Sequence, residues 1–288
     1  MLKNMKYRGE RYLKAIFLKY YGNRTLKIKD INLTVDFSDA GGRIYDSSWT
    51  HEEYESPLYD EIESCWNPRL VIDIGANYGF TGLISAKKFP DANVVMVEAS
   101  PKLCSFIQHN FEANNILDYE VVNSICGSSE DNDSQFSLNP SFSGDNRVIG
   151  EKGWKTVSVP TKSINAIIEE SYISGNVYIK IDTQGFEERV FNGAEKFLDT
   201  HNNWLIKTEY APHWLRSQGT DPLVFLRSLI LNYAVIEAPA RSHFNRNNLQ
   251  RLFHEPLAID ECEEFLSHVQ NLDDNNLGWC DLFIKPKG

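Results

Sequence analysis

The chain has 288 residues, of which 42% are hydrophobic and 12% aromatic, which is enough for one large domain. Its formal net charge of −11 and its isoelectric point of about 5.2 argue against nucleic acid or an anionic membrane as the main partner. The five cysteines are odd in number and none has CxxC spacing. We therefore expect reduced thiols in a cytoplasmic protein, and neither a zinc site nor a disulfide framework.

Residues 1–60 are expected to form an N-terminal appendage. Residues 1–20 mix many Lys and Arg side chains with Tyr, Leu and Ile, which predicts a basic helix. It either packs on its own domain or touches a membrane surface or an acidic partner, and it lacks the apolar core of a signal peptide or a membrane span. Residues 25–37 alternate like a half-buried hairpin, followed by a turn at 39–42. Helix and hairpin together could pair two chains into a homodimer.

From Leu70 onward short apolar runs alternate with helical patterns, so residues 61–288 are expected to form the main domain. Strands are predicted at 70–74, 93–99, 119–126, 154–161, 177–183, 203–210, 233–238 and 279–286. Helices are predicted at 80–89, 100–115, 162–172, 186–199 and 221–232, with a loop or short meander at 127–146. This alternation predicts an α/β fold with a mainly parallel sheet covered on both faces, and a ligand beyond the carboxyl ends of its strands.

The segment LVIDIGANYGFTG, residues 70–82, reads as strand, glycine turn and helix start. Gly75 can take the positive φ that a sharp turn requires, and Gly79 lets the backbone approach a ligand. The helix start at Phe80 and Thr81 presents free N–H groups that attract an anion. Asp73 ends the strand, where it can accept hydrogen bonds from the loop or from a ligand ammonium group.

Glu98 ends the next strand, where a carboxylate can accept both hydroxyls of a ribose. A dinucleotide fingerprint would read GxGxxG, but here Asn77 stands where a glycine would sit and an acid precedes the first glycine. S-adenosylmethionine has ribose and adenine but no pyrophosphate, and its carboxylate and ammonium suit a helix N-terminus beside an acid. NAD, or a turn that binds no ligand, remain the alternatives from the residues alone.

Four segments carry a resemblance to a known family: VIDIGANYGFTG (71–82), VVMVEASP (94–101), YIKIDTQGFEERVFNGAEKFL (178–198) and WLIKTEY (204–210). With them the chain, from about Leu70 to Lys287, resembles the FkbM-type family of S-adenosylmethionine-dependent methyltransferases. The resemblance implies a Rossmann-like seven-stranded sheet, mostly parallel with an antiparallel final strand. It also implies O-methylation, often of sugar or polyketide hydroxyls.

The same resemblance implies roles for residues of the cofactor site. Asp73, Gly75, Asn77 and Gly79 would line the methionine end of the cofactor, and Glu98 would bind the ribose. The residues that would border the adenine are Ala99 and Ser100 on one side and Ser124 and Ile125 on the other. The chain departs from the family pattern at Gln184, which replaces the Glu of KIDVEG, and at TKSIN (161–165), which weakens the usual acidic pair.

Three side chains at strand ends are candidates for a general base: Asp182, Glu209 and His213. His213 would be the base with one of the two acids orienting it, or else it is a surface histidine and the acids cap loops. Lys180 lies inside an apolar strand and needs a partner, either Glu187 or Glu209. Asp182 and Glu209 could instead hold Mg²⁺, although a clear third ligand is missing.

These observations favour an S-adenosylmethionine-dependent O-methyltransferase that acts on a hydroxyl of a sugar, a glycan or a small natural product. One alternative is a non-catalytic methyltransferase-like module that binds a partner through the N-terminal helix and the polar insertion at 241–278. A second is an NAD-dependent oxidoreductase. Residues 139–146 are either a substrate lid or an exposed loop.

Overall fold

The computed structural model describes residues 22–128, 134–171, 175–239 and 248–288. The predicted basic helix at 1–20, and with it the predicted pairing of two chains, lies outside these residues, as does the start of the 241–278 insertion. None of the helices within the described ranges is long and apolar enough to cross a membrane.

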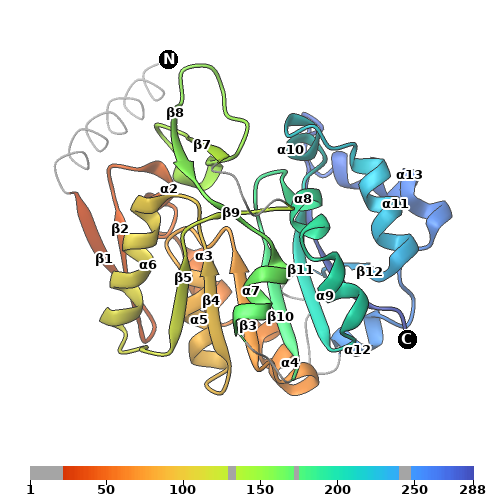
Figure 1. Cartoon of the computed structure of the whole chain (residues 1–288), viewed down its shortest axis with the longest axis horizontal. Helices are drawn as coiled ribbons and strands as arrows, with labels where there is room; N and C mark the ends of the chain where they lie inside the picture. The colour runs from red at the N-terminus through yellow and green to blue at the C-terminus, as the bar shows by residue number, and fades with distance from the viewer. Residues whose placement is uncertain (1–21, 129–133, 172–174, 240–247) are drawn as a thin grey trace, which may run out of the picture.

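The centre of the molecule is a seven-stranded sheet in the order β12-β13-β11-β10-β3-β4-β5 (Figure 1). Its strands are β3 (Leu70–Ile74), β4 (Asn93–Val97), β5 (Tyr119–Val122), β10 (Val177–Ile181), β11 (Trp204–Tyr210), β12 (Tyr233–Glu237) and β13 (Cys280–Pro286). The five strands from β11 to β5 run parallel, and β13 runs antiparallel to both of its neighbours. The strand order reverses between β3 and β10, and such a switch point leaves a crevice at the carboxyl ends.

Helices cover both faces of the sheet. Successive strand residues point to opposite sides, and the residues on both sides are apolar, so both faces must be buried. In β3, Leu70, Ile72 and Ile74 belong to one buried cluster and Val71 to the other. The first cluster packs under α7 (Ile164–Ser171), α8 (Glu187–Asn192), α9 (Glu195–Thr200), α11 (Pro222–Asn232) and α13 (Cys262–Gln270). The second packs under α4 (Pro57–Trp66), α5 (Phe80–Lys88), α6 (Pro101–Ala113) and α12 (Asn248–Leu252).

The N-terminal segment shares the core of the main domain. Its hairpin consists of β1 (Asn23–Ile28) and β2 (Ile31–Asp36), followed by α2 (Ala40–Arg43) and α3 (Ser48–Tyr54). The hairpin is fastened to α6, where Asn110 Oδ1 accepts from the backbone of Thr34 at 2.7 Å and its amide donates back to Thr34 O at 3.0 Å. Leu33 and Val35 lie in the same cluster as Val71 of the sheet.

Two predicted strands differ from the expectation: one leaves the central sheet partway along its length, and the other lies outside that sheet. The strand expected at 119–126 stops at Val122, because the Asn123 side chain turns in to donate to Glu98 O and Ala99 O at 2.9 and 3.0 Å. The chain continues as β6 (Ile125–Cys126), which pairs with β9 (Thr161–Lys162). The strand expected at 154–161 is β8 (Lys155–Val159), which pairs with β7 (Ser134–Leu138) in a separate hairpin.

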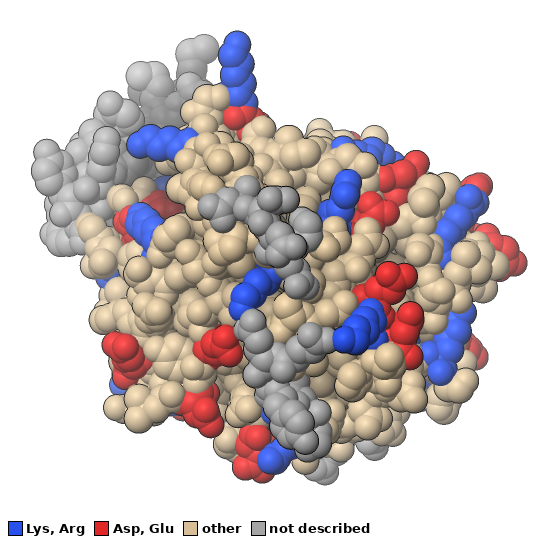
Figure 2. Space-filling view, in the orientation of Figure 1, with Lys and Arg blue, Asp and Glu red and all other residues tan. Residues whose placement is uncertain are grey.

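The long helix expected at 186–199 is two short helices, α8 and α9. The break falls at Gly193, whose carbonyl accepts from the Asn165 N–H at 3.1 Å instead of continuing a helical ladder. The remaining short elements are α10 (Pro212–Ser217) and the 3₁₀ turns η1 (Ser143–Asp145) and η3 (Ile259–Glu261). On the face shown in Figure 2, basic side chains stand singly beside acidic ones, most visibly over α11 and α13 at the right.

Candidate active site

A cavity of about 840 Å³ lies at the carboxyl ends of β3, β4, β10 and β11. Of the residues predicted for the site, the cavity is lined by Gly75, Asn77, Thr81, Glu98, Ala99, Ser124, Ile125, Asp182 and Glu209. The structure therefore brings both predicted groups, the cofactor set and the acids, to one place. It leaves Asp73, Gly79, Phe80, Ser100 and His213 out of the wall of this cavity.

The turn after β3 is held against the neighbouring strand ends. Gly75 has a φ of +77°, and its N–H donates to Val97 O at 2.9 Å. A Cβ on Gly75 would lie 1.9 Å from Asp182 O, so only glycine fits between the ends of β3 and β10. Asn77 also has a positive φ, 53°, and its N–H donates to Glu98 Oε2 at 2.9 Å. Asn77 Oδ1 is buried and has no partner among the described residues.

The Cβ direction of Gly79 and the side chain of Phe80 face the core, so the role expected of their backbone groups toward a ligand stays a prediction. Gly79 has a φ of +80° at the N-cap of α5, and a Cβ there would meet Ile107 at 3.3 Å rather than the cavity. The Phe80 ring is buried against Tyr45 and Trp49, with ring centroids 5.8 Å away in both cases. Thr81, on the next position of α5, does line the cavity.

Asp73 is completely buried behind the cavity wall, where Lys180 is its partner. Lys180 Nζ lies 3.3 Å from Asp73 Oδ1 and 3.4 Å from Asp182 Oδ2, so its partners are these two acids and not the expected Glu187 or Glu209. Burial raises the pKa of Asp73 and opposes the charge on Lys180, but the two carboxylates outweigh burial and raise the pKa of Lys180. The ion triplet joins the ends of β3 and β10 under the cavity.

Glu98 presents a buried carboxylate at the end of β4. Its Oε1 accepts from the Ser100 N–H at 2.8 Å, and its Oε2 accepts from Asn77. Burial raises the pKa of Glu98 to about 7, although the two backbone donors act in the opposite direction. Each carboxylate oxygen keeps a second lone pair, so Glu98 can still accept from a pair of ligand hydroxyls.

Next to Glu98 the cavity wall is apolar at Ala99 and Ile125, and this part of the cavity is called the apolar slot below. The sequence did not reveal its other walls, which come from the β7–β8 hairpin and from the turn before α8: Phe136, Val148 and Phe186. Ser124 is 2% exposed at the edge of the slot, and its hydroxyl has no partner within the described part of the chain. Ser100 lies outside the slot and caps α6, where its Oγ accepts from the Leu103 N–H at 3.5 Å.

The opposite end of the cavity is acidic. Glu209 on β11 faces Asp281 on β13 in the antiparallel register, and its Oε2 is buried without a partner among the described residues. Burial raises the pKa of Glu209 well above its ordinary value, and the like charges of Asp182, Glu187 and Asp281 raise it further. Lys207 Nζ, from the same strand, pairs with Asp281 Oδ2 at 2.8 Å.

The turn after β10 fixes the position of Asp182. Glu187 Oε1 accepts from the Thr183 N–H and from the Thr183 hydroxyl, each at 2.9 Å, which ties the turn to the start of α8. The Gln184 amide donates to Asp182 Oδ1 at 2.9 Å. Gln184 thus gives Asp182 a neutral hydrogen-bond donor at the position where the family pattern has a glutamate.

His213 lies apart from the cavity, which removes the reason for assigning it as the base. It is exposed at the start of α10, and its ring packs edge-on against Trp214 with centroids 5.0 Å apart. Trp214 does line the cavity, whereas Tyr210 is a core residue whose hydroxyl donates to Pro222 O at 3.0 Å. No group of three or more His, Cys, Asp or Glu residues in the described ranges could hold a metal ion.

Sequence reasoning missed the wall that the N-terminal segment supplies. The cavity is also lined by Ile44, Tyr45, Trp49 and Glu53 of this segment, and by Trp279 from the segment before β13. Tyr45 lies in the turn between α2 and α3 and Trp49 lies in α3, so the two share no helical repeat that the sequence could have shown. Lys207, in contrast, was visible as a second charged residue inside an apolar strand, WLIKTEY.

Comparison with known proteins places this geometry in a family. Residues 73–234 match the Methyltransferase FkbM domain. Comparison with curated proteins gives no match. Among solved structures, an O-methyltransferase from Bacillus cereus in complex with SAH is 13% identical, with 81% of this chain and 80% of that chain covered and a TM-score of 0.42.

A precorrin-6y C5,15-methyltransferase from Geobacter metallireducens GS-15 is also 13% identical, with 64% of this chain and 73% of that chain covered and a TM-score of 0.38. At these scores the structural likenesses say nothing about the acceptor of this chain. The family match, in contrast, covers more than half of the sequence and includes both the glycine turn and the two acids of the cavity. The chain belongs to the FkbM family of methyltransferases.

Proposed function

We propose that this chain transfers a methyl group from S-adenosylmethionine to a hydroxyl group of a sugar, a glycan or a small natural product. One observation carries the proposal: the two ends of a single cavity differ in chemistry. At one end, the carboxylate of Glu98, which could accept hydrogen bonds from ribose hydroxyls, lies beside an apolar slot. The other end has Glu209, a buried carboxylate whose pKa is raised and whose Oε2 has no partner among the described residues.

The hydrogen-bonding groups and the apolar wall of the cofactor end support S-adenosylmethionine as the ligand. Glu98 would accept from the ribose hydroxyls, and the slot between Ala99, Ile125 and Phe136 would hold the adenine. The unpartnered Ser124 hydroxyl and Asn77 Oδ1 would each gain a partner, which removes the cost of leaving them buried and unpaired. When bound, the cofactor supplies an activated methyl group on a sulfonium, so the protein contributes mostly position.

At the other end, Glu209 would take the proton of the acceptor hydroxyl. A general base works best when its pKa is close to the operating pH, and the raised pKa of Glu209 moves it in that direction. Asp182 would orient the acceptor, because Gln184 and Lys180 hold its two oxygens in place. This assigns the base to Glu209 and gives His213 no part in the reaction.

The acceptor end also suits a hydroxylated ring. The side chains of Trp49 and Trp279 supply aromatic surface, and those of Glu53 and Asp281 supply carboxylate acceptors for further hydroxyls. Trp279 is 55% exposed and therefore lies where the cavity meets solvent. Aromatic faces and carboxylates together can hold the apolar face and the polar rim of one sugar ring.

The test is transfer of labelled methyl from S-adenosylmethionine to a panel of neutral glycosides and hydroxylated natural products, with NAD binding measured in parallel. We expect S-adenosylhomocysteine and an O-methylated product to form in equal amounts. Binding of S-adenosylmethionine without transfer to any member of the panel would favour the non-catalytic module. Binding of NAD in preference to S-adenosylmethionine would favour the oxidoreductase.

A further inference from the structure

The loop between β7 and β8 forms a strap over the cavity, defined here as residues 139–149. The residues by which it lines the cavity are Phe142, Ser143, Gly144, Asp145, Asn146 and Val148. The β7–β8 hairpin that carries it lies between α2 on one side and α10 on the other (Figure 1). The strap is attached on both sides, so its position is set by these attachments.

The first attachment is to the N-terminal segment and uses mostly backbone groups. The Ala40 N–H donates to Ser141 O at 3.0 Å, and Asp39 Oδ1 accepts from the Ser143 N–H at 3.0 Å. The two segments touch closely, because a Cβ on Gly41 would lie 2.3 Å from the Ser143 hydroxyl oxygen. On this side the strap is therefore held by one hydrogen bond between backbone groups and one to the Asp39 carboxylate.

The second attachment is to α10. The Ile149 N–H donates to Gln218 Oε1 at 2.8 Å, and the Gln218 amide donates back to Ile149 O at 3.0 Å. The amide group of Gln218 thus bonds both backbone groups of Ile149, as a neighbouring β-strand would. Gln218 is 4% exposed, so both hydrogen bonds are made by a side chain that is itself buried.

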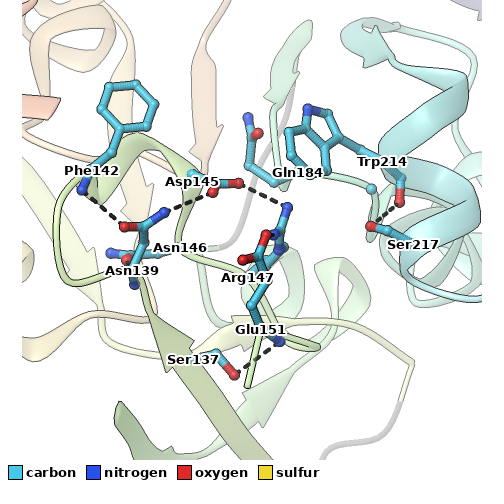
Figure 3. A network of polar contacts seen from close by, with 12 residues as sticks. Ser137, Asn139, Phe142, Asp145, Asn146, Arg147, Glu151, Gln184, Trp214 and Ser217 are labelled. Atoms are coloured by element: carbon cyan, nitrogen blue, oxygen red, sulfur yellow. Dashed lines mark hydrogen bonds and ion pairs between the residues drawn. The ribbon is translucent and has the colours of Figure 1, made fainter. Parts of the chain in front are cut away.

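Arg147 adds a charged anchor between the strap and α10 (Figure 3). It is 3% exposed, with one guanidinium nitrogen 2.9 Å from Asp145 Oδ1 and the other 3.1 Å from Glu151 Oε1. Its guanidinium carbon lies 4.3 Å from the ring centroid of Trp214 and 4.8 Å from that of Trp154. Two ion pairs in a fork and two aromatic faces are a combination that arginine can satisfy and lysine cannot.

Two of these four partners belong to the cavity wall. Asp145 and Trp214 both line the cavity, and they come from segments about seventy residues apart that Arg147 holds together. Asn139 also donates to Asp145 Oδ2 at 2.8 Å, so both oxygens of this carboxylate are fixed from within the strap. Val148, the neighbour of Arg147, forms part of the apolar slot.

We propose that Arg147 is a positioning residue for the ligand cavity: it holds the strap against α10 and so keeps the adenine slot and the Asp145–Trp214 wall formed before the ligand arrives. The inference rests on the proposed function, because it takes S-adenosylmethionine and its product as the ligands. Losing Arg147 would let the strap leave its closed position. If the closed arrangement falls to about a tenth of the population, the apparent Kd rises about tenfold.

The test compares Arg147→Met and Arg147→Lys with the wild type, using S-adenosylhomocysteine and adenosine as probes. In Arg147→Met we expect both to bind about tenfold more weakly, and S-adenosylhomocysteine to leave faster in stopped-flow fluorescence. Arg147→Lys keeps the charge but not the fork, and it should recover part of the loss. The matched control is Arg227→Met, which removes an exposed ion pair with Glu263 at 2.9 Å away from the cavity and should leave both probes unchanged.

A purely structural role for Arg147 would lower the melting temperature and leave the ligands unaffected. The proposal is therefore overturned if folded Arg147→Met binds and releases S-adenosylhomocysteine as the wild type does. If Arg147→Met does not fold, the same criterion is applied to Trp154→Leu, which removes one face of the stack and leaves both ion pairs in place. Failure of the wild type to bind S-adenosylhomocysteine would instead overturn the proposed function and this inference with it.

Discussion

The two ends of the cavity are built in different ways. At the cofactor end, the glycine turn at residues 75–79 and the end of β4 at Glu98 follow consecutive strands and are linked by a hydrogen bond from the Asn77 N–H, and the β7–β8 hairpin adds Phe136 and Val148 to the slot. The acceptor end is assembled from distant segments: Tyr45 and Trp49 from the N-terminal segment, Glu209 from β11, and Trp279 and Asp281 from the end of the chain.

The difference shows that few residue types are tolerated at the cofactor end, whereas more are tolerated at the acceptor end. The cofactor end depends on backbone groups, a glycine with positive φ and a buried carboxylate, so few other residues fit there. The acceptor end depends on side chains that each element supplies separately. Changing one of them alters the ligand surface without disturbing the sheet below it.

The largest expected effect is at the acceptor end. Glu209→Gln removes the proposed base, and we expect kcat for methyl transfer to fall by roughly a hundredfold or more, with S-adenosylhomocysteine affinity changed by less than about twofold. Glu237→Gln on β12, which is separated from β11 by β13 and loses only an exposed contact with His268, is the matched control. Unchanged kcat in Glu209→Gln would remove Glu209 from the mechanism.

The same variant has a second expected effect, on stability. The folded-state pKa of Glu209 is raised, so the ligand-free protein loses stability as the pH rises from the ordinary carboxyl range through that raised pKa. A neutral glutamine removes this loss. Glu209→Gln should therefore unfold at a higher temperature than the wild type at neutral pH and at a similar temperature in acid, as measured by calorimetry.

A smaller effect is expected from Gly75→Ala at the cofactor end. Alanine must accept a positive φ and must also displace Asp182 O, which would lie 1.9 Å from its Cβ. We expect a loss of about 3 kcal/mol in the free energy of unfolding, together with loss of S-adenosylhomocysteine binding. Gly219→Ala, with a φ of +87° and open space around its Cβ, carries the first cost only and should lose about 1 kcal/mol.

The smallest effect on folding is expected at the mouth of the cavity. Trp279 is 55% exposed, so Trp279→Ala should change the free energy of unfolding by less than about 0.5 kcal/mol. We expect it to raise KM for the acceptor several-fold and to leave S-adenosylhomocysteine binding unchanged. An equal loss of affinity for acceptor and cofactor would mean that the two ends of the cavity are not separate sites.

The parts of the fold predicted from sequence are those fixed by local patterns. The strand at 70–74 and its glycine turn follow from an apolar run and from residues that tolerate positive φ, and the structure has both. Where long-range contacts decide, the prediction was wrong: Asn123 bends the 119–126 strand out of the sheet, and Gly193 divides the expected long helix.

The same rule explains which site residues were predicted. Glu98 was found because it ends the next strand after the glycine turn and its helix, whereas Tyr45 and Arg147 reach the cavity region through tertiary packing that leaves no spacing signal. His213 was expected because it follows Glu209 by four residues, but α10 begins at Pro212 and leaves the imidazole exposed. Sequence separation alone does not give the direction of a side chain after a turn.

The central claim is that Glu98 binds the ribose of an S-adenosyl cofactor, and calorimetric titration with S-adenosylhomocysteine tests it most directly. The pKa of Glu98 in the ligand-free protein is about 7, and hydroxyl donors need the unprotonated carboxylate. Wild-type affinity should therefore fall as the pH falls below about 7, while Glu98→Gln binds at least about tenfold more weakly and without this pH dependence. Wild-type protein that fails to bind, or a Glu98→Gln variant that binds as tightly as the wild type at pH about 8, would contradict the account.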